Sequence, residues 1–252
     1  MKKNLVSVIT PTWNRGETFL PRTIESVQRQ LENSVEHEHI IVDNASSDNT
    51  RKVVREYAKK DPRIKYIRSP KNVKASGALN IGFKASKGSF IYPLDDDDCL
   101  LPYALENFYD EFVKSPKVEW MYGVPLIIDA NDVVNFRWRW PNRYYPTPKQ
   151  MFWNLMKADF ICNGTVMMRR SAVAKVKGWD LTLASQDYTM WLKLAYAGLK
   201  HKQLRQYVLF YRQHDKRESN KNAVNGVWAG VRQYLLKKFN TTEEEIVAKT
   251  KS

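Results

Sequence analysis

Short apolar runs alternate with amphipathic stretches through the first hundred residues of the chain. The apolar runs are four to six residues long and are typical of buried strands; they lie at residues 5–10, 39–43, 64–67 and 89–94. The stretches between them predict helices at about residues 17–31, from about 48 through Tyr57, and at 76–85. The first of these helices has one apolar face, formed by Phe19, Ile24, Val27 and Leu31.

This alternation predicts an α/β fold with a mostly parallel central sheet, because strands joined through helices form βαβ crossovers. In such sheets ligands bind beyond the carboxyl ends of the strands. Three polar clusters occupy this position, at residues 11–15, 43–48 and 95–98. The sequence therefore predicts one functional site where the three clusters meet.

The second half of the chain has a less regular pattern. Its expected elements are a helix at 101–114, an apolar stretch at 118–128, a strand at 160–168, a helix at 185–197, a strand at 207–211 and a helix at 222–238. In the helix at 185–197, the side chains expected to face inward are Trp191, Leu192, Leu194 and Ala195. Residues 135–145 interleave aromatic side chains with arginines, which fits either stacking on bases or sugars, or a hairpin with its aromatic side inward.

Four consecutive aspartates at residues 95–98 follow the expected fourth strand. Adjacent carboxylates repel one another strongly in a low-dielectric site, and a divalent cation removes this repulsion. Oxygen ligands suit Mg²⁺ or Mn²⁺, which are usually held by one or two carboxylates plus substrate phosphates. The quartet therefore indicates a metal site for a phosphate-bearing ligand. The alternative is a solvated acidic turn that caps the next helix.

Composition excludes several classes of protein. A hydrophobic content of 43% in 252 residues argues against disorder. No apolar run approaches the ~18–20 residues needed to span a bilayer, and the first apolar run is too short for a signal-peptide core. Two cysteines, Cys99 and Cys162, are too few for a disulfide framework or a cysteine zinc site. We therefore expect a cytoplasmic protein.

Phosphate-binding loops of the GxxxxGK[ST] and GxGxxG types are absent, which disfavours nucleotide triphosphate hydrolysis and dinucleotide redox chemistry. The polar clusters instead resemble the family 2 glycosyltransferases of the GT-A fold, which are inverting enzymes that use nucleotide-diphosphate sugars. The resemblance rests on VITPTWNR at 8–15, IVDNASSD at 41–48 and LDDDD at 94–98. It is continuous to about residue 115, and resumes more weakly at 164–170, 178–180, 186–192 and 211–214.

The resemblance implies that the N-terminal half binds the donor, with UDP expected because it is the family's commonest nucleotide. The residues implied to contact the donor are Pro11, Thr12, Trp13, Asn14, Arg15, Asp43, Asn44, Lys74, Asp95 and Asp96. Among these, Asp43 would contact the base, and Asp95 would lie near the ribose and the metal. Lys74 could reach a phosphate, but it fits a solvated lysine equally well.

The resemblance also implies the metal ligands and the catalytic base. Asp95, Asp97 and His214 would hold Mn²⁺ or Mg²⁺, although a lone histidine at a strand end is often structural. Asp187 matches the family's general base near the start of a helix, and it would accept the proton of the attacking acceptor hydroxyl.

Three departures from the family pattern qualify this assignment. Gln186 stands where the family usually has an acid, so Asp187 lacks its usual partner. Lys74 replaces a common glycine, and Leu79 stands where arginine is frequent. The QxxRW signature of processive synthases is absent, so we expect transfer of one sugar per encounter.

The excess of positive over negative charge lies entirely in the second half of the chain. The net charge is +14, yet residues 1–133 carry 19 basic and 19 acidic side chains, whereas residues 134–252 carry 22 and 8. In the family the second half meets the acceptor, so three acidic partners fit: an anionic membrane surface with a lipid-linked acceptor, an acidic glycan, or nucleic acid. A basic helix at 222–238 suits peripheral membrane contact, or simply packs its apolar stripe into the core.

We therefore expect a single GT-A domain over residues 1–252, with a donor half (1–115), an acceptor and catalytic half (116–215) and a basic C-terminal segment (216–252). Its expected role is surface-glycan synthesis on a saccharide or lipid-linked acceptor, at the inner face of the membrane. The alternatives are the same chemistry on a hydroxylated DNA base, a nucleic-acid-binding protein or nuclease, and an inactive binding module suggested by Gln186.

Overall fold

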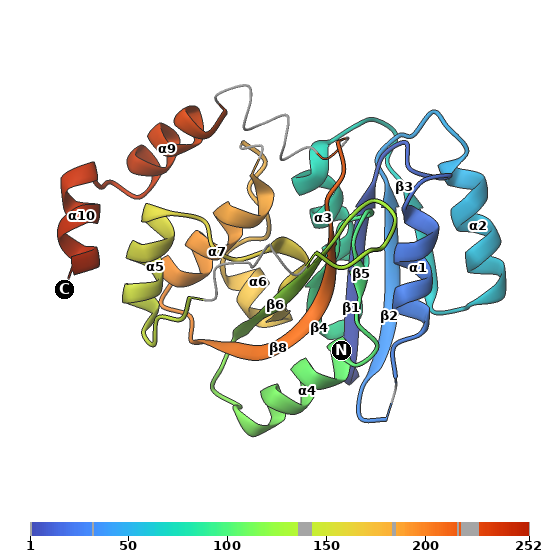
Figure 1. Cartoon of the computed structure of the whole chain (residues 1–252), viewed down its shortest axis with the longest axis horizontal. Coiled ribbons are helices and arrows are strands. Elements are labelled where there is room, and N and C mark those ends of the chain that lie inside the picture. Colours follow the sequence, from blue (N-terminus) through green and yellow to red (C-terminus); the bar gives the residue numbers. More distant parts are fainter. Residues whose placement is uncertain are drawn as a thin grey trace.

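The structure is a computed structural model that describes residues 2–31, 33–135, 143–182, 185–215, 217 and 227–251 (Figure 1). Its strands are β1 (Lys2–Thr12), β2 (Glu36–Asp43), β3 (Ile64–Arg68), β4 (Gly88–Pro93), β5 (Cys99–Leu100), β6 (Trp120–Ile128), β7 (Val166–Arg169) and β8 (His201–Arg212). Its helices are α1 (Leu20–Gln28), α2 (Thr50–Lys60), α3 (Lys74–Ala85), α4 (Ala104–Lys114), α5 (Pro148–Lys157), the 3₁₀ turn η1 (Asn163–Thr165), α6 (Arg170–Lys175), α7 (Gln186–Tyr196), α9 (Val227–Lys238) and α10 (Glu243–Lys251).

The described strands form one sheet in the order β3-β2-β1-β4-β7-β6-β8-β5. The first four are parallel, because β1 pairs with β2 and β4 and β2 pairs with β3. β7 runs antiparallel to both β4 and β6, and β8 is parallel to β6. This arrangement confirms the predicted α/β fold with a mostly parallel sheet.

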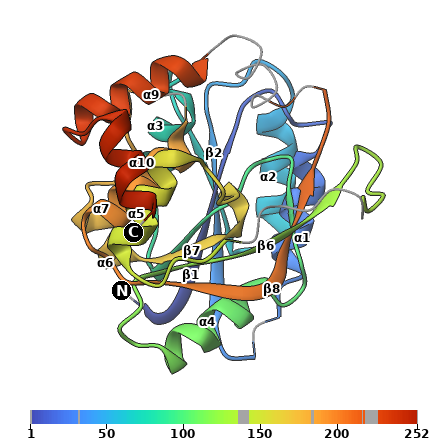
Figure 2. The ribbon, with the colours of Figure 1, turned by 60° about the vertical axis from the view of Figure 1, so that its left-hand side comes forward.

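The sheet is covered on both faces. Alternate side chains of β1 point to opposite sides, so that Val6 and Val8 pack with α1 and α4 while Ile9 packs with α3. Helices α5, α7, α9 and α10 gather at one end of the molecule, and α1 and α2 lie at the other (Figure 1, Figure 2). No helix within the described part of the chain is both long and apolar enough to cross a membrane.

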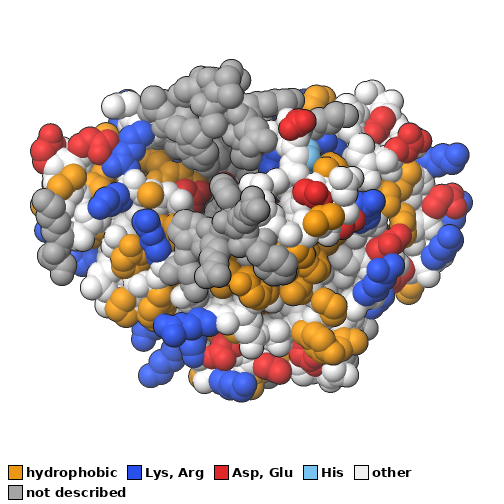
Figure 3. Space-filling view, in the orientation of Figure 1, with side chains coloured by type: hydrophobic (Ala, Val, Ile, Leu, Met, Phe, Trp, Pro, Cys, Tyr) orange, Lys and Arg blue, Asp and Glu red, His pale blue; other side chains and the backbone are white. Residues whose placement is uncertain are grey.

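Surface charge follows the division seen in the sequence. In Figure 3, acidic and basic side chains alternate on the side of α1 and α2, whereas basic side chains gather at the lower left, near the start of β8. The arginine-rich segment at 136–142 and residues 222–226 of the expected basic helix lie outside the described residues.

The predicted strand at 160–168 is wrong in its first part. Residues 163–165 form η1, and β7 begins only at Val166. Gly164 lies so close to Leu209 of β8 that a Cβ there would come within 2.8 Å of the leucine side chain. Its carbonyl also accepts a hydrogen bond from Tyr92 Oη at 2.5 Å. These contacts bend the chain before it joins the sheet, and the bend brings Asn163 to the predicted site.

Other boundaries also differ. α1 ends at Gln28, so Leu31 is exposed and does not belong to its apolar face. The strand predicted at 207–211 is the end of the longer β8. Helices α5, α6 and α10 were not predicted. The predicted inward face of α7, with Trp191 and its neighbours, is buried as expected.

Candidate active site

The loops after β1 and β2 are joined by hydrogen bonds into one platform. The two strands end in register, with Thr12 opposite Asp43. The Asn14 amide donates to Ser46 Oγ at 2.9 Å, and the Ser47 amide donates to Asn14 Oδ1 at 2.8 Å. Asn14 adopts a φ of 55°, a left-handed conformation that asparagine tolerates better than most residues. Two of the predicted donor-binding segments therefore form a single surface.

The next residues anchor this platform to α2. The Arg15 amide donates to Thr50 Oγ1 at 3.1 Å, and the Gly16 amide donates to Asp48 Oδ2 at 3.2 Å. A Cβ at Gly16 would lie 2.6 Å from the Thr50 nitrogen, so the close approach requires glycine. Trp13 is 54% exposed, and Pro11, before it, is half-buried. The platform thus displays an aromatic ring next to a fixed backbone.

Asp43 is the buried centre of the platform. Its Oδ1 accepts from the Ser46 amide at 2.8 Å, and its Oδ2 accepts from Tyr66 Oη at 2.5 Å and from Arg68 Nη1 at 2.7 Å. Burial alone would raise the pKa of Asp43, but these hydrogen bonds hold it below its ordinary value. The group is therefore a carboxylate held by hydrogen bonds from Tyr66, Ser46 and Arg68.

Asn44 holds the loop that leads into α3, which begins at Lys74. Asn44 Oδ1 accepts from the Val73 amide at 2.8 Å, and its Nδ2 donates to Asn72 Oδ1 at 2.9 Å. Lys74 has a φ of 60° and an exposed side chain. Asn44 therefore fixes the backbone from which the Lys74 side chain extends into solvent.

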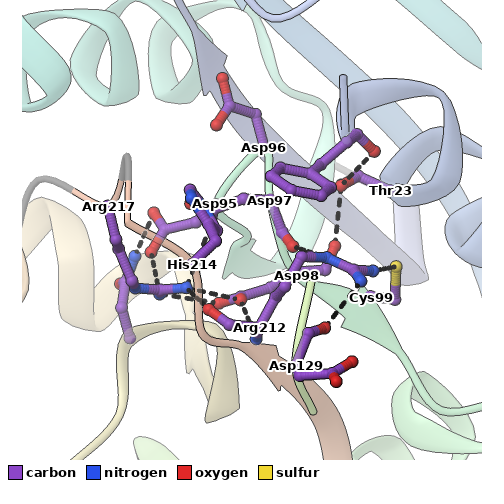
Figure 4. Close-up of polar contacts among 12 residues, drawn as sticks. Thr23, Asp95, Asp96, Asp97, Asp98, Cys99, Asp129, Arg212, His214 and Arg217 are labelled. Carbon is purple, nitrogen blue, oxygen red and sulfur yellow. Dashed lines mark hydrogen bonds and ion pairs between the residues drawn. The ribbon is translucent and has the colours of Figure 1, made fainter. Parts of the chain in front are cut away.

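An acidic cluster lies at the carboxyl end of β4 (Figure 4). One oxygen from each of Asp95, Asp97 and Asp98 lies within 4.8 Å of the others. His214 Nε2 is 2.9 Å from Asp97 Oδ2, and Asn163 Nδ2 donates to Asp95 Oδ1 at 2.8 Å. The structure thus brings Asp95 and Asp97 together and places His214 against Asp97, but the third member of the acidic group is Asp98, which was not predicted as a ligand. Carboxylate oxygens with one imidazole are ligands that Mg²⁺ and Mn²⁺ accept, so these residues fit a divalent cation.

The pKa values of Asp95 and Asp97 depend on burial, on the neighbouring carboxylates and on the guanidinium of Arg217. Burial, then the charges of Asp98 and Asp97, raises the pKa of Asp95 well above its ordinary value, and Arg217 offsets this only in part. Burial would also raise the pKa of Asp97, but Arg217 and the His214 hydrogen bond keep it below its ordinary value. Arg217 therefore outweighs burial at Asp97, with the help of His214, but not at Asp95.

Asp96 points away from the other three aspartates, toward the β1 loop (Figure 4). Its Oδ1 lies 3.8 Å from Arg15 Nε. Burial and the charge of Asp97 raise the pKa of Asp96 to about 7, against the opposing effect of Arg15. Asp96 therefore faces Arg15 of the β1 loop, and its contact with the donor stays a prediction.

Arg212 supports the acidic turn from behind, and the sequence did not single it out. Its side chain is fully buried, its amide donates to Asp98 Oδ1 at 2.9 Å, and its Nε donates to the Asp97 carbonyl at 2.9 Å. The guanidinium also lies 4.8 Å from the centre of the Phe19 ring. The only signal in the sequence was its position two residues before His214.

Asp187 lies in the first turn of α7. Its Oδ1 accepts from the Tyr188 amide at 2.8 Å and from Ser185 Oγ at 3.3 Å. Burial raises the pKa of Asp187, and these hydrogen bonds oppose the shift. A carboxylate with a raised pKa is a stronger proton acceptor once ionised.

A second acid near Asp187 was missed in the sequence. Asp159 follows α5, and its Oδ1 accepts from the Ile161 amide at 3.3 Å. Burial, and then the charge of Asp187, raises the pKa of Asp159 well above its ordinary value, so the two carboxylates interact. Helices α5 and α7 are locked together there, because Tyr188 Oη donates to the Leu155 carbonyl at 2.6 Å. A single aspartate in an unremarkable stretch gave no signal for this placement.

The loops after β1 and β2 and the acidic cluster after β4 thus lie together at the carboxyl ends of parallel strands, where α/β folds bind their ligands. The profile of Glycosyl transferase family 2 matches residues 7–177, and the chain belongs to this family. It is therefore a glycosyltransferase enzyme, as its sequence predicted.

Two named relatives come from bacteria. The chain is 28% identical to the Escherichia coli UDP-Glc:alpha-D-GlcNAc-diphosphoundecaprenol beta-1,3-glucosyltransferase WfaP, over 83% of this chain and 78% of that protein. It is 35% identical to the Staphylococcus aureus poly(ribitol-phosphate) beta-N-acetylglucosaminyltransferase TarP, over 70% of this chain and 52% of that protein. The chain thus spans only about half the length of TarP.

Two solved structures share the fold. S. aureus TarS in complex with UDP-GlcNAc superposes with a TM-score of 0.67 at 18% identity, covering 87% of this chain and 61% of that one. The mannosyltransferase PcManGT from Pyrobaculum calidifontis, in complex with GDP-Man and Mn²⁺, gives a TM-score of 0.63 at 17% identity, covering 84% and 57%.

Proposed function

We propose that this protein transfers one sugar, with inversion, from a UDP-sugar to a hydroxyl of a saccharide or lipid-linked acceptor, with the help of Mn²⁺ or Mg²⁺. The observation that carries the proposal is the carboxylate group of Asp95, Asp97 and Asp98, with His214 against Asp97, in a turn that the Arg15–Asp96 ion pair joins to the β1 loop. We assign the donor role to residues 1–115 and the acceptor role to 116–215, within one domain over 1–252. Residues 216–252 complete that domain.

The donor platform supports a nucleoside diphosphate. We assign contact with the base to Asp43, and the exposed Trp13 ring lies on the same platform. Lys74 extends from α3 next to Asn44, on the same platform. UDP is the nucleotide in TarS and in the WfaP donor, which supports UDP here.

Asp95, Asp97 and His214 would hold the cation, which when bound neutralises the charge of the leaving diphosphate. Asp187 would accept the proton of the acceptor hydroxyl as that oxygen attacks the anomeric carbon from the side opposite the diphosphate. The Tyr188 amide and Ser185 hold the Asp187 carboxylate in place for this step.

The acceptor is assigned from the relatives and from charge. WfaP and TarP are named for a lipid-linked and a polymeric acceptor, and both acceptor classes carry phosphate in those names. The excess of basic residues after residue 134 suits such an anionic acceptor, or the inner membrane surface that carries a lipid-linked one. The hydroxylated DNA base and the nucleic-acid-binding alternatives receive no support from these names.

The test is a donor screen with the purified chain. UDP-glucose, UDP-GlcNAc and GDP-mannose are incubated with Mn²⁺ or Mg²⁺, and release of the nucleoside diphosphate is measured with and without saccharide acceptors. We expect release from a UDP-sugar that depends on the cation and is lost in Asp187→Asn. Turnover that persists in EDTA, or that prefers GDP-mannose, would contradict the corresponding part of the proposal.

A further inference from the structure

The Arg217 guanidinium lies inside the acidic cluster (Figure 4). Its Nη1 is 3.0 Å from Asp98 Oδ1 and 3.4 Å from Asp97 Oδ1, and its Nη2 is 3.2 Å from Asp98 Oδ2 and 3.7 Å from Asp95 Oδ2. The side chain is only 9% exposed. An organic cation thus occupies the space between the carboxylates that would surround a divalent one.

The contacts of Arg217 are unequal. Asp98 is fully buried and engages the guanidinium through both of its oxygens, whereas Asp97 and Asp95 each make one longer contact. The Tyr211 ring centre, 3.8 Å from the guanidinium carbon, adds a further attachment. Removing Arg217 entirely would leave the Asp98 carboxylate buried without its partner, which is strongly unfavourable. Losing only the longer contacts of Arg217 with Asp95 and Asp97 costs far less free energy.

We propose that Arg217 is an internal competitor for the divalent cation: it occupies Asp95 and Asp97 until the cation displaces it, and Asp98 anchors it throughout. This inference rests on the proposed function, since it concerns the same cation site. The three aspartates around Arg217 then have two roles. Asp95 and Asp97 bind either the guanidinium or the divalent cation, and Asp98 holds the guanidinium in both states.

Competition of this kind couples binding of the cation to binding of the donor. A site that is competent in only a fraction of molecules shows an affinity reduced by that fraction. The phosphates of a nucleoside diphosphate can interact with both the cation and the displaced Arg217 guanidinium. The nucleotide therefore favours the state in which the cation has displaced Arg217 from Asp95 and Asp97. The cation therefore binds weakly to the free protein and more tightly with UDP, and UDP gains by the same factor.

The experiment measures Mn²⁺ affinity of the full chain without nucleotide, by electron paramagnetic resonance of free Mn²⁺. Arg217→Gln removes the competitor, so we expect Mn²⁺ to bind about tenfold more tightly or better than to the wild type. UDP should then add little further affinity in this variant. The control is Arg205→Gln on β8, an exposed residue whose loss changes net charge equally.

Equal Mn²⁺ affinity in Arg217→Gln and wild type, or an equal gain in Arg205→Gln, would overturn the inference. If Arg217→Gln does not fold, Arg217→Lys serves instead, because a single ammonium cannot span two carboxylates as a guanidinium does; an intermediate gain supports the inference and no gain overturns it. Wild-type protein that binds Mn²⁺ with UDP, while the variants show no gain, leaves the proposed function standing and removes only the role of Arg217. Absence of Mn²⁺ binding in every variant, with or without UDP, overturns both.

Discussion

The imidazole of His214 lies 2.9 Å from the carboxylate of Asp97, although 117 positions separate the two residues in the chain. β4 ends just before Asp97, and β8 ends just before His214, so the two strands deliver the pair to one point. A cation held by both side chains would tie the two halves of the chain together at the donor platform.

We expect His214→Ala and Asp97→Ala to weaken Mn²⁺ binding in the presence of UDP by about tenfold or more, because changes even to groups that only support metal ligands have effects on that scale. Isothermal titration calorimetry with Mn²⁺ and UDP measures the effect. Asp215→Ala is the matched control, since it removes an exposed carboxylate next to His214. The same affinity in His214→Ala as in the control would remove His214 from the ligand set.

Asp187→Asn should lower the transfer rate by ~10²–10⁴-fold while leaving UDP-sugar affinity unchanged, because the amide cannot accept the hydroxyl proton. Steady-state transfer and donor binding are measured on the same preparation. Gln186→Ala changes the adjacent position in α7 without removing a titratable group, so it controls for packing damage. Near-full transfer by Asp187→Asn would contradict the assignment of Asp187 as the general base.

The pH dependence of transfer should show the raised pKa of Asp187. Burial places this pKa above the ordinary value for an aspartate, and a general base works only when deprotonated. We therefore expect kcat/KM to fall, as the pH is lowered, at a pH above the ordinary aspartate range of about 3.9. A profile that stays flat down to pH 4 would contradict the prediction.

His39 predicts a pH dependence of stability. Burial, then the charge of His37, lowers the pKa of His39 from 6.5 to about 3, and its Nε2 lies 2.9 Å from Thr10 Oγ1. At pH values between about 3 and 6.5, His39 is therefore protonated in the unfolded chain but not in the folded one. The free energy of unfolding should fall with decreasing pH by up to about 1.4 kcal/mol per unit.

The comparison is between wild type and His39→Gln, unfolded in urea at several pH values between 7 and 4. Carboxylates contribute equally to both proteins, so the difference in slope isolates His39. Parallel curves would show that His39 does not titrate between the two states.

Strand positions in the donor half followed from the sequence because the short apolar runs of β1, β2 and β4 are buried on both sides, while β3 at the sheet edge keeps only part of this pattern. The site could be placed there for the same reason, since the ends of parallel strands converge whatever the loops contain. Asp95 and Asp43 could therefore be assigned to the site from their positions after these runs, as could the loop around Asn14. Their partners Asn163, Tyr66 and Arg68 could not, because no sequence pattern connects them to the aspartates.

The acceptor half was less predictable because tertiary contacts decide its conformation. Residues 160–168 read as one strand, but the approach of Gly164 to Leu209 breaks it. Arg217 and Asp159 carry no local pattern that marks them, and their importance comes from the carboxylates they meet through packing. Such residues are visible only once the strands are placed.

The antiparallel strand β7 has a consequence for engineering. It pairs with β4 at Phe90 and Ile91, just before the acidic cluster, and with β6 on its other edge. A chimera cut at residue 115 would replace both β7 and β6 against a foreign β4, so the seam would run beside the acidic cluster. Exchanging residues 129–157 between relatives instead keeps all three strands native, so the sheet beside the acidic cluster stays intact.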